Sequence, residues 1–186
     1  MKVILHNRKL IRLKGFDYSS SNAYFVTICC KDFTEYFGFI KNQEMILSNS
    51  GIVVYNCWTE LETTFNNISL DEFIVMPNHF HGIICIIGDP LSQKQDFSIE
   101  KTKGWILMKN PDLTLGKIIR HFKAKSAKLI RESYNKKFKW QPRYFDRIVR
   151  NEREMNSIRE YIASNPLKWN LEKNIYDETD SIIKLL

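Results

Sequence analysis

Two apolar segments joined by a very short connection constrain the fold more than any other feature of the sequence. Residues 68–76 and 79–87 are rich in β-branched and aromatic side chains, and only Pro77 and Asn78 separate them. Such segments favour strands, and a connection this short favours antiparallel pairing. The sequence therefore predicts two neighbouring antiparallel strands near the middle of the chain.

Further periodic segments surround this strand pair. Apolar residues on both parities predict a central strand, covered on both faces, over residues 23–30. Helical spacing predicts one helix after Ser48 or Ser50 and another that starts near Asp112 or Thr114. Residues 36–40 and 44–47 are strand-like and favour a small hairpin. Residues 143–150 are expected to form the last strand of the sheet.

A final helix is expected to begin at Asn151, because Glu154 three residues later completes the pattern of a capping box. Residues three or four apart lie side by side on a helix, so this segment carries two neighbouring stripes. Met155, Ile158 and Ile162 form an apolar stripe, and Ser157, Tyr161 and Asn165 form an adjacent one.

The order of these elements predicts an α+β fold. Strand, helix, strand, strand, helix and strand make a β-α-β-β-α-β core with a ferredoxin-like antiparallel sheet, and the last helix is added at its C-terminal end. The 186 residues suit a single domain, and no internal repeat is present. Within that domain we expect a basic N-terminal arm over 1–22, a long loop over 88–112 and a C-terminal tail over 172–186.

Positive charge is concentrated in one part of the chain. Residues 101–150 carry 15 basic and 3 acidic side chains, whereas residues 51–100 carry 1 and 7. A charge density of this kind is typical of a surface that meets a polyanion, although a merely solvated basic face is the alternative. The residues expected to contact a nucleic acid are Arg12, Lys14, Lys117, Arg120, Lys123, Lys128, Lys136, Lys137, Lys139 and Arg143.

Composition favours a soluble, cytoplasmic protein. No apolar stretch approaches the length of about 18 residues that a membrane span requires. Cys29, Cys30, Cys57 and Cys85 lack the spacing of a zinc site or a disulfide framework, so we expect reduced thiols that pack in the core.

The histidine pair His79 and His81 is the first candidate for chemistry. Residues two apart in a strand share one face, so the two imidazoles are expected to project side by side. Such a pair can hold a divalent metal if a further ligand arrives from elsewhere in the fold. A packed, purely structural pair of histidines is the alternative.

Several longer motifs resemble one family, the REP-associated tyrosine transposases of the HUH superfamily of single-strand DNA endonucleases. The resembling segments are RKLIRLKGFDY, AYFVTICC, LDEFIVMPNHFHGII, WQPRYFDRIVRNE and EYIASNPLKW. The resemblance implies that His79, His81 and Asn165 bind a divalent ion, Mg²⁺ or Mn²⁺, and that Tyr161 is the nucleophile. It further implies a transposase that cleaves and rejoins single-stranded DNA near hairpins through a 5′-phosphotyrosine intermediate.

Some points stay open at the level of the sequence. Tyr144 is the rival nucleophile, and many relatives carry a histidine where this chain has Arg147. His121 is expected to face DNA or to be partly buried. One alternative function is a protein that binds DNA hairpins without cleaving them. A second is a phosphoesterase that acts on small molecules, although the basic segment fits this function less well. Both a homodimer and a monomer are compatible with the sequence.

Overall fold

The computed structural model describes residues 21–87 and 114–169, and its centre is a four-stranded sheet with the order β4-β5-β1-β6. All neighbouring strands pair antiparallel. The strands are β1 (Ala23–Cys29), β4 (Ile68–Val75), β5 (His79–Ile86) and β6 (Phe145–Val149). The predicted α+β class with a ferredoxin-like antiparallel sheet is confirmed.

The hairpin and the three predicted helices follow in the predicted order, and the short elements η1 and α2 are additional. Ser48, Thr114 and Asn151 each accept a backbone hydrogen bond as the residue that caps a helix. These elements are η1 (Lys31–Phe33), the hairpin β2 (Gly38–Lys41) and β3 (Glu44–Leu47), and the helices α1 (Asn49–Thr59), α2 (Leu61–Thr64), α3 (Leu115–Ser133) and α4 (Glu152–Ala163). The predicted loop over 88–112 and tail over 172–186 lie outside the described residues, as does the predicted arm apart from its last two residues.

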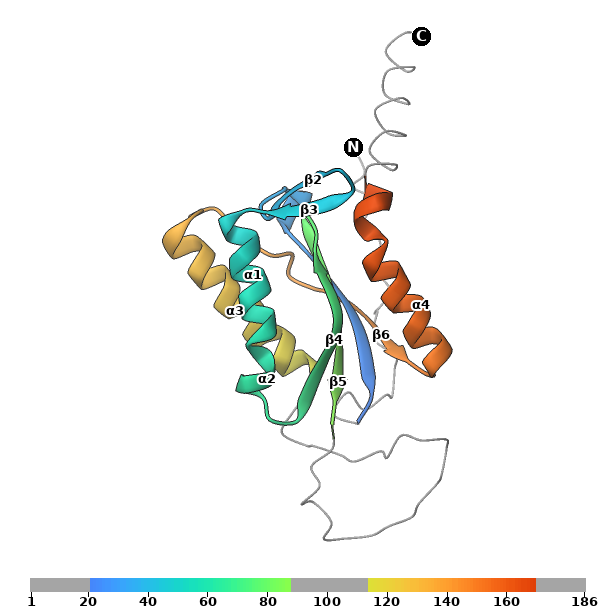
Figure 1. Ribbon diagram of the computed structural model, residues 1–186. Coiled ribbons are helices and arrows are strands. Elements are labelled where there is room, and N and C mark those ends of the chain that lie inside the picture. Colours follow the sequence, from blue (N-terminus) through green and yellow to red (C-terminus); the bar gives the residue numbers. More distant parts are fainter. Residues whose placement is uncertain (1–20, 88–113, 170–186) are drawn as a thin grey trace, which may run out of the picture.

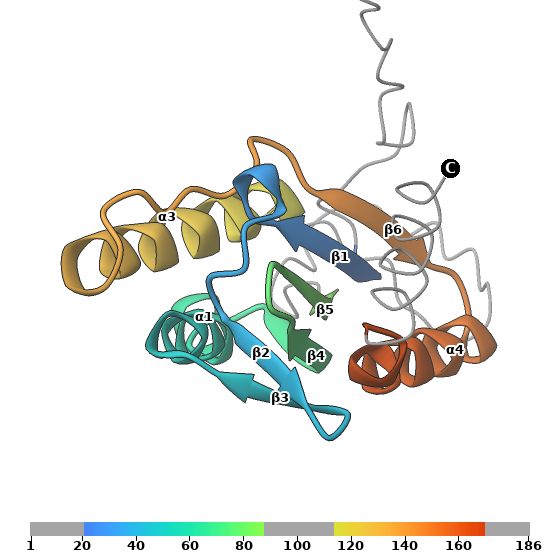
Figure 2. The ribbon, with the colours of Figure 1, turned by 90° about the horizontal axis from the view of Figure 1, so that it is seen from above.

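Helices cover the two faces of the sheet unequally. Figures 1 and 2 show α1 and α3 on one face and α4 on the other. Even-numbered residues of β1 and β5 point to the α1 and α3 side, where Tyr24, Val26 and Phe80 are fully buried. Gly82 belongs to the same face, and a Cβ there would lie 2.6 Å from Cζ2 of Trp58, so the glycine allows the indole of α1 to pack directly on β5.

A smaller apolar core holds α4 on the opposite face. Met155, Ile158 and Ile162 are buried against Phe25 of β1 and Ile83 of β5. The predicted apolar stripe of the last helix is therefore the stripe that packs on the sheet.

An ion pair adds a directional constraint between α4 and the sheet. Arg159 of α4 donates from Nε and Nη2 to the two carboxylate oxygens of Asp71 on β4, at 2.8 and 2.6 Å. A bidentate arginine–carboxylate pair fixes orientation as well as distance. Arg159 also holds the pKa of the Asp71 carboxyl below its ordinary value.

The four cysteines are all free. Cys30 and Cys57 are buried, and burial raises the pKa of the Cys57 thiol to about 11. Along residues 21–87 and 114–169, no helix combines the length and the apolar composition needed to cross a membrane.

A buried hydrogen bond connects α3 with the segment that leads into β6. The indole Nε1 of Trp140 donates to Oγ of Ser126 at 3.1 Å, and this hydroxyl in turn donates to the Phe122 carbonyl at 2.7 Å. Ser126 is fully buried. The serine is thus the acceptor for a polar group that has little access to water.

We expect Ser126→Ala to lower the free energy of unfolding by about 1–3 kcal/mol, because the indole N–H would stay buried without an acceptor. Ser157→Ala on α4 is the matched control, since Ser157 makes the same kind of bond to its own helix but is exposed. Urea unfolding at constant m-value measures both. Equal midpoints for the two variants would contradict the role given to Ser126.

Candidate active site

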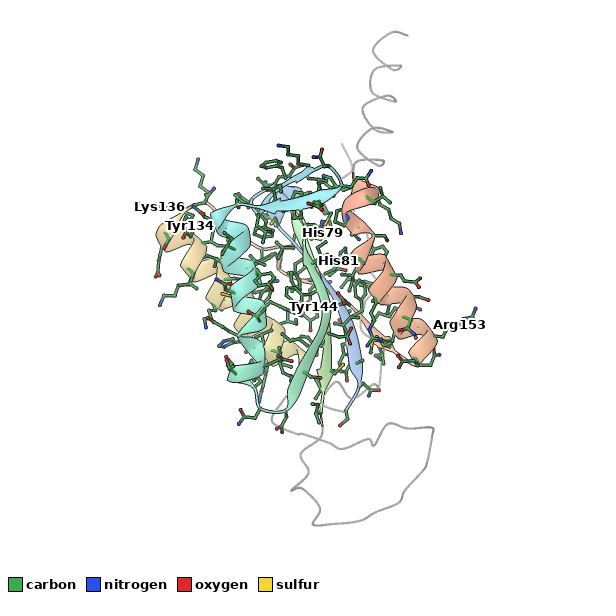
Figure 3. The ribbon with its side chains drawn as sticks, viewed as in Figure 1. His79, His81, Tyr134, Lys136, Tyr144 and Arg153 are labelled. Carbon is green, nitrogen blue, oxygen red and sulfur yellow. The ribbon has the colours of Figure 1, made fainter. Side chains whose placement is uncertain are left out.

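His79 and His81 project from β5 toward α4, on the sheet face opposite to the main core (Figure 3). Their ring centroids are 4.7 Å apart, as expected for residues two apart in a strand. His81 is buried and its ring stacks on Phe25 of β1 at 5.4 Å between centroids. The sequence prediction that both imidazoles share one face is therefore correct.

Hydrogen bonds fix which nitrogen of His79 carries the proton. The side-chain amide nitrogen of Asn78 donates to the Phe33 carbonyl at 3.0 Å, which turns the amide oxygen toward His79. That oxygen lies 2.7 Å from Nδ1 of His79 and can only accept. Nδ1 is thus the protonated nitrogen, and Nε2 of His79 keeps its lone pair.

His81 has a comparable partner on the neighbouring strand. Its Nδ1 lies 2.8 Å from Oγ1 of Thr27, the residue that faces it in the β1–β5 register. A partner at Nδ1 fixes the orientation of the ring and leaves Nε2 directed toward α4.

Both histidines are neutral near neutral pH. Burial lowers the pKa of His79 to about 4, and a hydrogen bond with the Asn165 side chain opposes this shift only in part. Burial, with a smaller contribution from the neighbouring His79, lowers the pKa of His81 to about 3. Neutral imidazoles are the form that binds metals.

Tyr161 of α4 reaches the same place. Its hydroxyl lies 3.5 Å from Nε2 of His81, at the limit of hydrogen-bonding distance. Its ring makes edge contacts with His81 and Phe25, and the ammonium group of Lys168 lies 5.2 Å from the ring centroid. Residue Tyr161 is nevertheless 40% exposed, so a solvent-borne substrate can approach it.

Asn165 completes the group. The turn at Ser164 ends α4, and residues 165–169 form a further helical segment that begins with the buried Asn165. Its side chain hydrogen-bonds with His79, and Trp169 of the same segment lies 5.7 Å from His79 between ring centroids. The structure therefore brings His79, His81, Tyr161 and Asn165 together within one protomer.

The donor atoms present fit a divalent ion. No cluster of three or more His, Cys, Asp or Glu side chains occurs among the residues that the structure describes. Two neutral imidazoles and one amide oxygen would make a weak, open set of ligands that leaves positions for substrate oxygens. These are the ligands that the sequence resemblance implies.

The predicted DNA-binding residues gather elsewhere. Lys117, Arg120, Lys123 and Lys128 belong to α3, which covers the sheet face opposite to the histidines, and Lys136, Lys137, Lys139 and Arg143 follow this helix in the chain. Figure 3 shows Lys136 at the far end of α3, remote from α4. Arg120, Lys123 and Lys139 line a groove between α3 and the segment after it. Arg12 and Lys14 lie outside the described residues.

Lys123 also has a structural task. Its ammonium group donates to the carbonyls of Gln141, Pro142 and Arg143, the shortest bond being 2.6 Å. Burial lowers the pKa of this lysine. Lys123 thus holds the turn that leads into β6, a role that sequence reasoning missed.

The structure separates Tyr144 from the histidines. Its side chain is partly buried against the main core and lines the α3 groove, on the other side of the sheet. Arg147, by contrast, lies on the α4 side and pairs with Glu154 at 2.5 Å. His121 is partly buried and its ring meets that of Phe65 edge to face.

Sequence reasoning also missed the residues that orient the histidines. Asn78 is next to His79 in the chain, so the MPNH motif carried a usable signal. Thr27 is 54 positions from His81, and only the strand register brings the two together.

Comparison with known proteins gives three findings. The family model described as "Transposase IS200 like" matches residues 98–165, a range that includes Tyr161 and Asn165 and starts after the histidine strand. An uncharacterized protein of Haemophilus influenzae is 37% identical over 173 residues, which cover 93% of this chain and 96% of the relative. A solved REP-associated tyrosine transposase, bound to a REP hairpin, has a similar fold.

That structure superposes with a TM-score of 0.53 at 15% identity and covers 84% of this chain and 73% of its own. At this identity the likeness concerns the fold. The matched family model and the shared fold agree with the family that the sequence motifs indicated. Over residues 98–165, the chain is therefore similar to the IS200-like transposases, and its fold is similar to that of a REP-associated tyrosine transposase.

Proposed function

We propose that the protein cleaves and rejoins single-stranded DNA near hairpins, with Tyr161 as the nucleophile and a divalent ion held by His79, His81 and Asn165. One observation carries this proposal: the Tyr161 hydroxyl lies 3.5 Å from Nε2 of His81, so nucleophile and ligands meet without a second subunit. The structural neighbour bound to a REP hairpin supports a folded DNA strand as the substrate.

The proposed reaction is a transfer of one phosphodiester bond. The phenol oxygen of Tyr161 attacks the scissile phosphorus and gives up its proton, while the bond from phosphorus to the 3′ oxygen breaks and that oxygen takes up a proton. The products are a 5′-phosphotyrosine and a free 3′-hydroxyl. Attack of a 3′-hydroxyl on the phosphotyrosine reverses the step and rejoins DNA, so the bond energy is conserved.

Other groups around the proposed phosphate position would stabilise charge and orient the reacting side chains. Mg²⁺ or Mn²⁺, when bound, would polarise the phosphate and offset its developing charge. Asn78 and Thr27 hold the imidazoles in the orientation needed, and the contacts with Phe25 and His81 hold the phenol ring. Lys168 adds positive charge beside the nucleophile.

The basic groove along α3 is proposed to bind the DNA backbone on the other side of the sheet. Arg120, Lys123, Arg131 and Lys139 line it, and none of the acidic residues within 21–87 and 114–169 does. A lining of this kind attracts phosphates independently of sequence. We therefore assign the duplex stem of the hairpin to this groove and the reacting strand to the face with Tyr161.

We expect Tyr161→Phe to abolish the covalent adduct because the variant lacks the attacking oxygen. The assay incubates the protein with Mn²⁺ and a hairpin-bearing single strand labelled at its 3′ or its 5′ end, followed by a denaturing gel. Only the 3′-labelled strand should migrate with the protein. Tyr134→Phe at the end of α3 and Tyr144→Phe are the controls, and an adduct that survives Tyr161→Phe would exclude this mechanism.

We expect Thr27→Val to weaken Mn²⁺ binding by about 10- to 100-fold, because His81 would lose the partner that orients its ring. Adduct formation titrated with Mn²⁺ should shift to higher concentrations and recover at saturation, and a chelator should abolish it for wild type. Thr63→Val on the exposed helix α2 is the matched control. An unchanged Mn²⁺ titration for Thr27→Val would contradict the role given to Thr27.

We expect the metal-free protein to lose stability as the pH falls below 6.5, which is the ordinary pKa of histidine. The loss should continue down to the lowered pKa values of the folded protein, about 4 for His79 and about 3 for His81. In this range the unfolded chain binds protons that the folded chain excludes. The slope should approach about 1.4 kcal/mol per pH unit for each histidine. Urea unfolding in chelator measures it, and a His79→Gln/His81→Gln variant with the same slope would refute the assignment.

A further inference from the structure

A second groove lies directly beside Tyr161, between the edge strand β6 and the first turns of α4. Its lining includes Phe145 and Arg147 from β6, Arg150 from the connection between β6 and α4, Arg153 from the first turn of α4, and Tyr161 itself. Phe145, Arg147, Arg150 and Arg153 do not line the basic groove along α3. This groove therefore offers a surface for the reacting strand on the same side of the sheet as the histidines.

The strand register places Phe145 level with the histidines. Thr27 of β1 faces His81 of β5 on one side and Phe145 of β6 on the other. The two outer residues are thus two strand spacings apart, about 10 Å. Their side chains point to the same face, so a group bound at His81 and Tyr161 has Phe145 as a neighbour in the same row.

Phe145 has an accessible ring. It is 45% exposed on the edge strand of the sheet, whereas Phe25 and Phe80 in the neighbouring strands are buried. An exposed aromatic ring among cations is the arrangement that proteins use to stack an unpaired base while they hold its backbone. A base within a duplex is already stacked on its neighbours, so this surface suits unpaired DNA.

The arginines supply the complementary charge. Among the residues that the structure describes, the charged groups that line the groove are three arginines and one carboxylate, that of Glu154. Glu154 orients Arg147 by an ion pair at 2.5 Å, yet 58% of the Arg147 side chain stays exposed. A guanidinium group held in place in this way can donate its outer N–H groups to a phosphate. Figure 3 shows Arg153 at the outer end of α4.

We propose that this groove binds the unpaired DNA segment that contains the scissile phosphate, with Phe145 stacking one base and Arg147 and Arg153 contacting neighbouring phosphates. The proposal rests on the proposed function, because that function supplies the single strand. It assigns the unpaired segment to β6 and α4 and leaves the duplex stem to α3.

The test measures binding without cleavage. A fluorescent, unpaired oligonucleotide is titrated with the full-length protein in chelator, and anisotropy gives the Kd. Phe145→Ala and Phe145→Leu should both weaken binding by about 5- to 100-fold, since leucine keeps the apolar volume but has no ring face. Phe145→Trp should retain binding, and Phe39→Ala, which removes an exposed ring on β2, is the matched control.

The arginines are tested by salt dependence. Arg153→Gln should weaken binding of the unpaired oligonucleotide and reduce the slope of log Kd against log salt by about 0.7, the value for one phosphate contact on a single strand. Arg131→Gln, in the α3 groove, is the matched control and should leave the Kd of that oligonucleotide unchanged. Urea unfolding of every variant checks that the fold is intact.

Binding by Phe145→Leu at wild-type strength would overturn the stacking role, and equal effects of Arg153→Gln and Arg131→Gln would overturn the assignment of the groove. The covalent adduct assay separates this proposal from the proposed function. If the wild-type protein forms the adduct but the groove variants bind DNA normally, the proposed function is supported and the role of the groove is contradicted. If no adduct forms but the groove variants lose binding as expected, the role of the groove is supported and the proposed function is contradicted.

Discussion

The candidate active site depends on how α4 packs against the open face of the sheet. Three apolar residues and the Asp71–Arg159 ion pair hold this helix in place. Apolar burial supplies the attraction, and the bidentate ion pair supplies orientation. Because Tyr161 lies on the same helix, this packing alone brings its hydroxyl to 3.5 Å from His81. Without α4 the histidines would have no phenol group beside them.

The two faces of the sheet have different roles because side chains alternate along each strand. Even-numbered residues of β1 and β5 form the large core with α1 and α3, which stabilises the sheet. The odd-numbered residues of the same strands include Thr27, His79 and His81, so the rigid strands that build the core also position the site. Sites on such strands hold their geometry more precisely than sites on loops.

Hydrogen bonds and burial fix the orientation and the charge of the two histidines. Asn78 fixes the proton of His79 at Nδ1, and Thr27 occupies Nδ1 of His81. Burial keeps both rings neutral by opposing a positive charge in an apolar environment. Nε2 of both rings therefore faces the space that Tyr161 and Asn165 also approach, and Nε2 of His79 carries a lone pair there.

The sequence by itself determined the β-α-β-β-α-β order, the caps of α1, α3 and α4, and the shared face of His79 and His81, because period and capping are local properties. Motif resemblance named Tyr161 and Asn165. Only the tertiary structure showed that Thr27 lies beside His81 and that the basic helix α3 covers the opposite face of the sheet. It also showed that Phe145 and Arg153 line the same groove as Tyr161. Each of these spatial relations joins residues that are far apart in the chain. The relations depend on the strand register and on the face of the sheet that each helix covers, and local periodicity specifies neither of these.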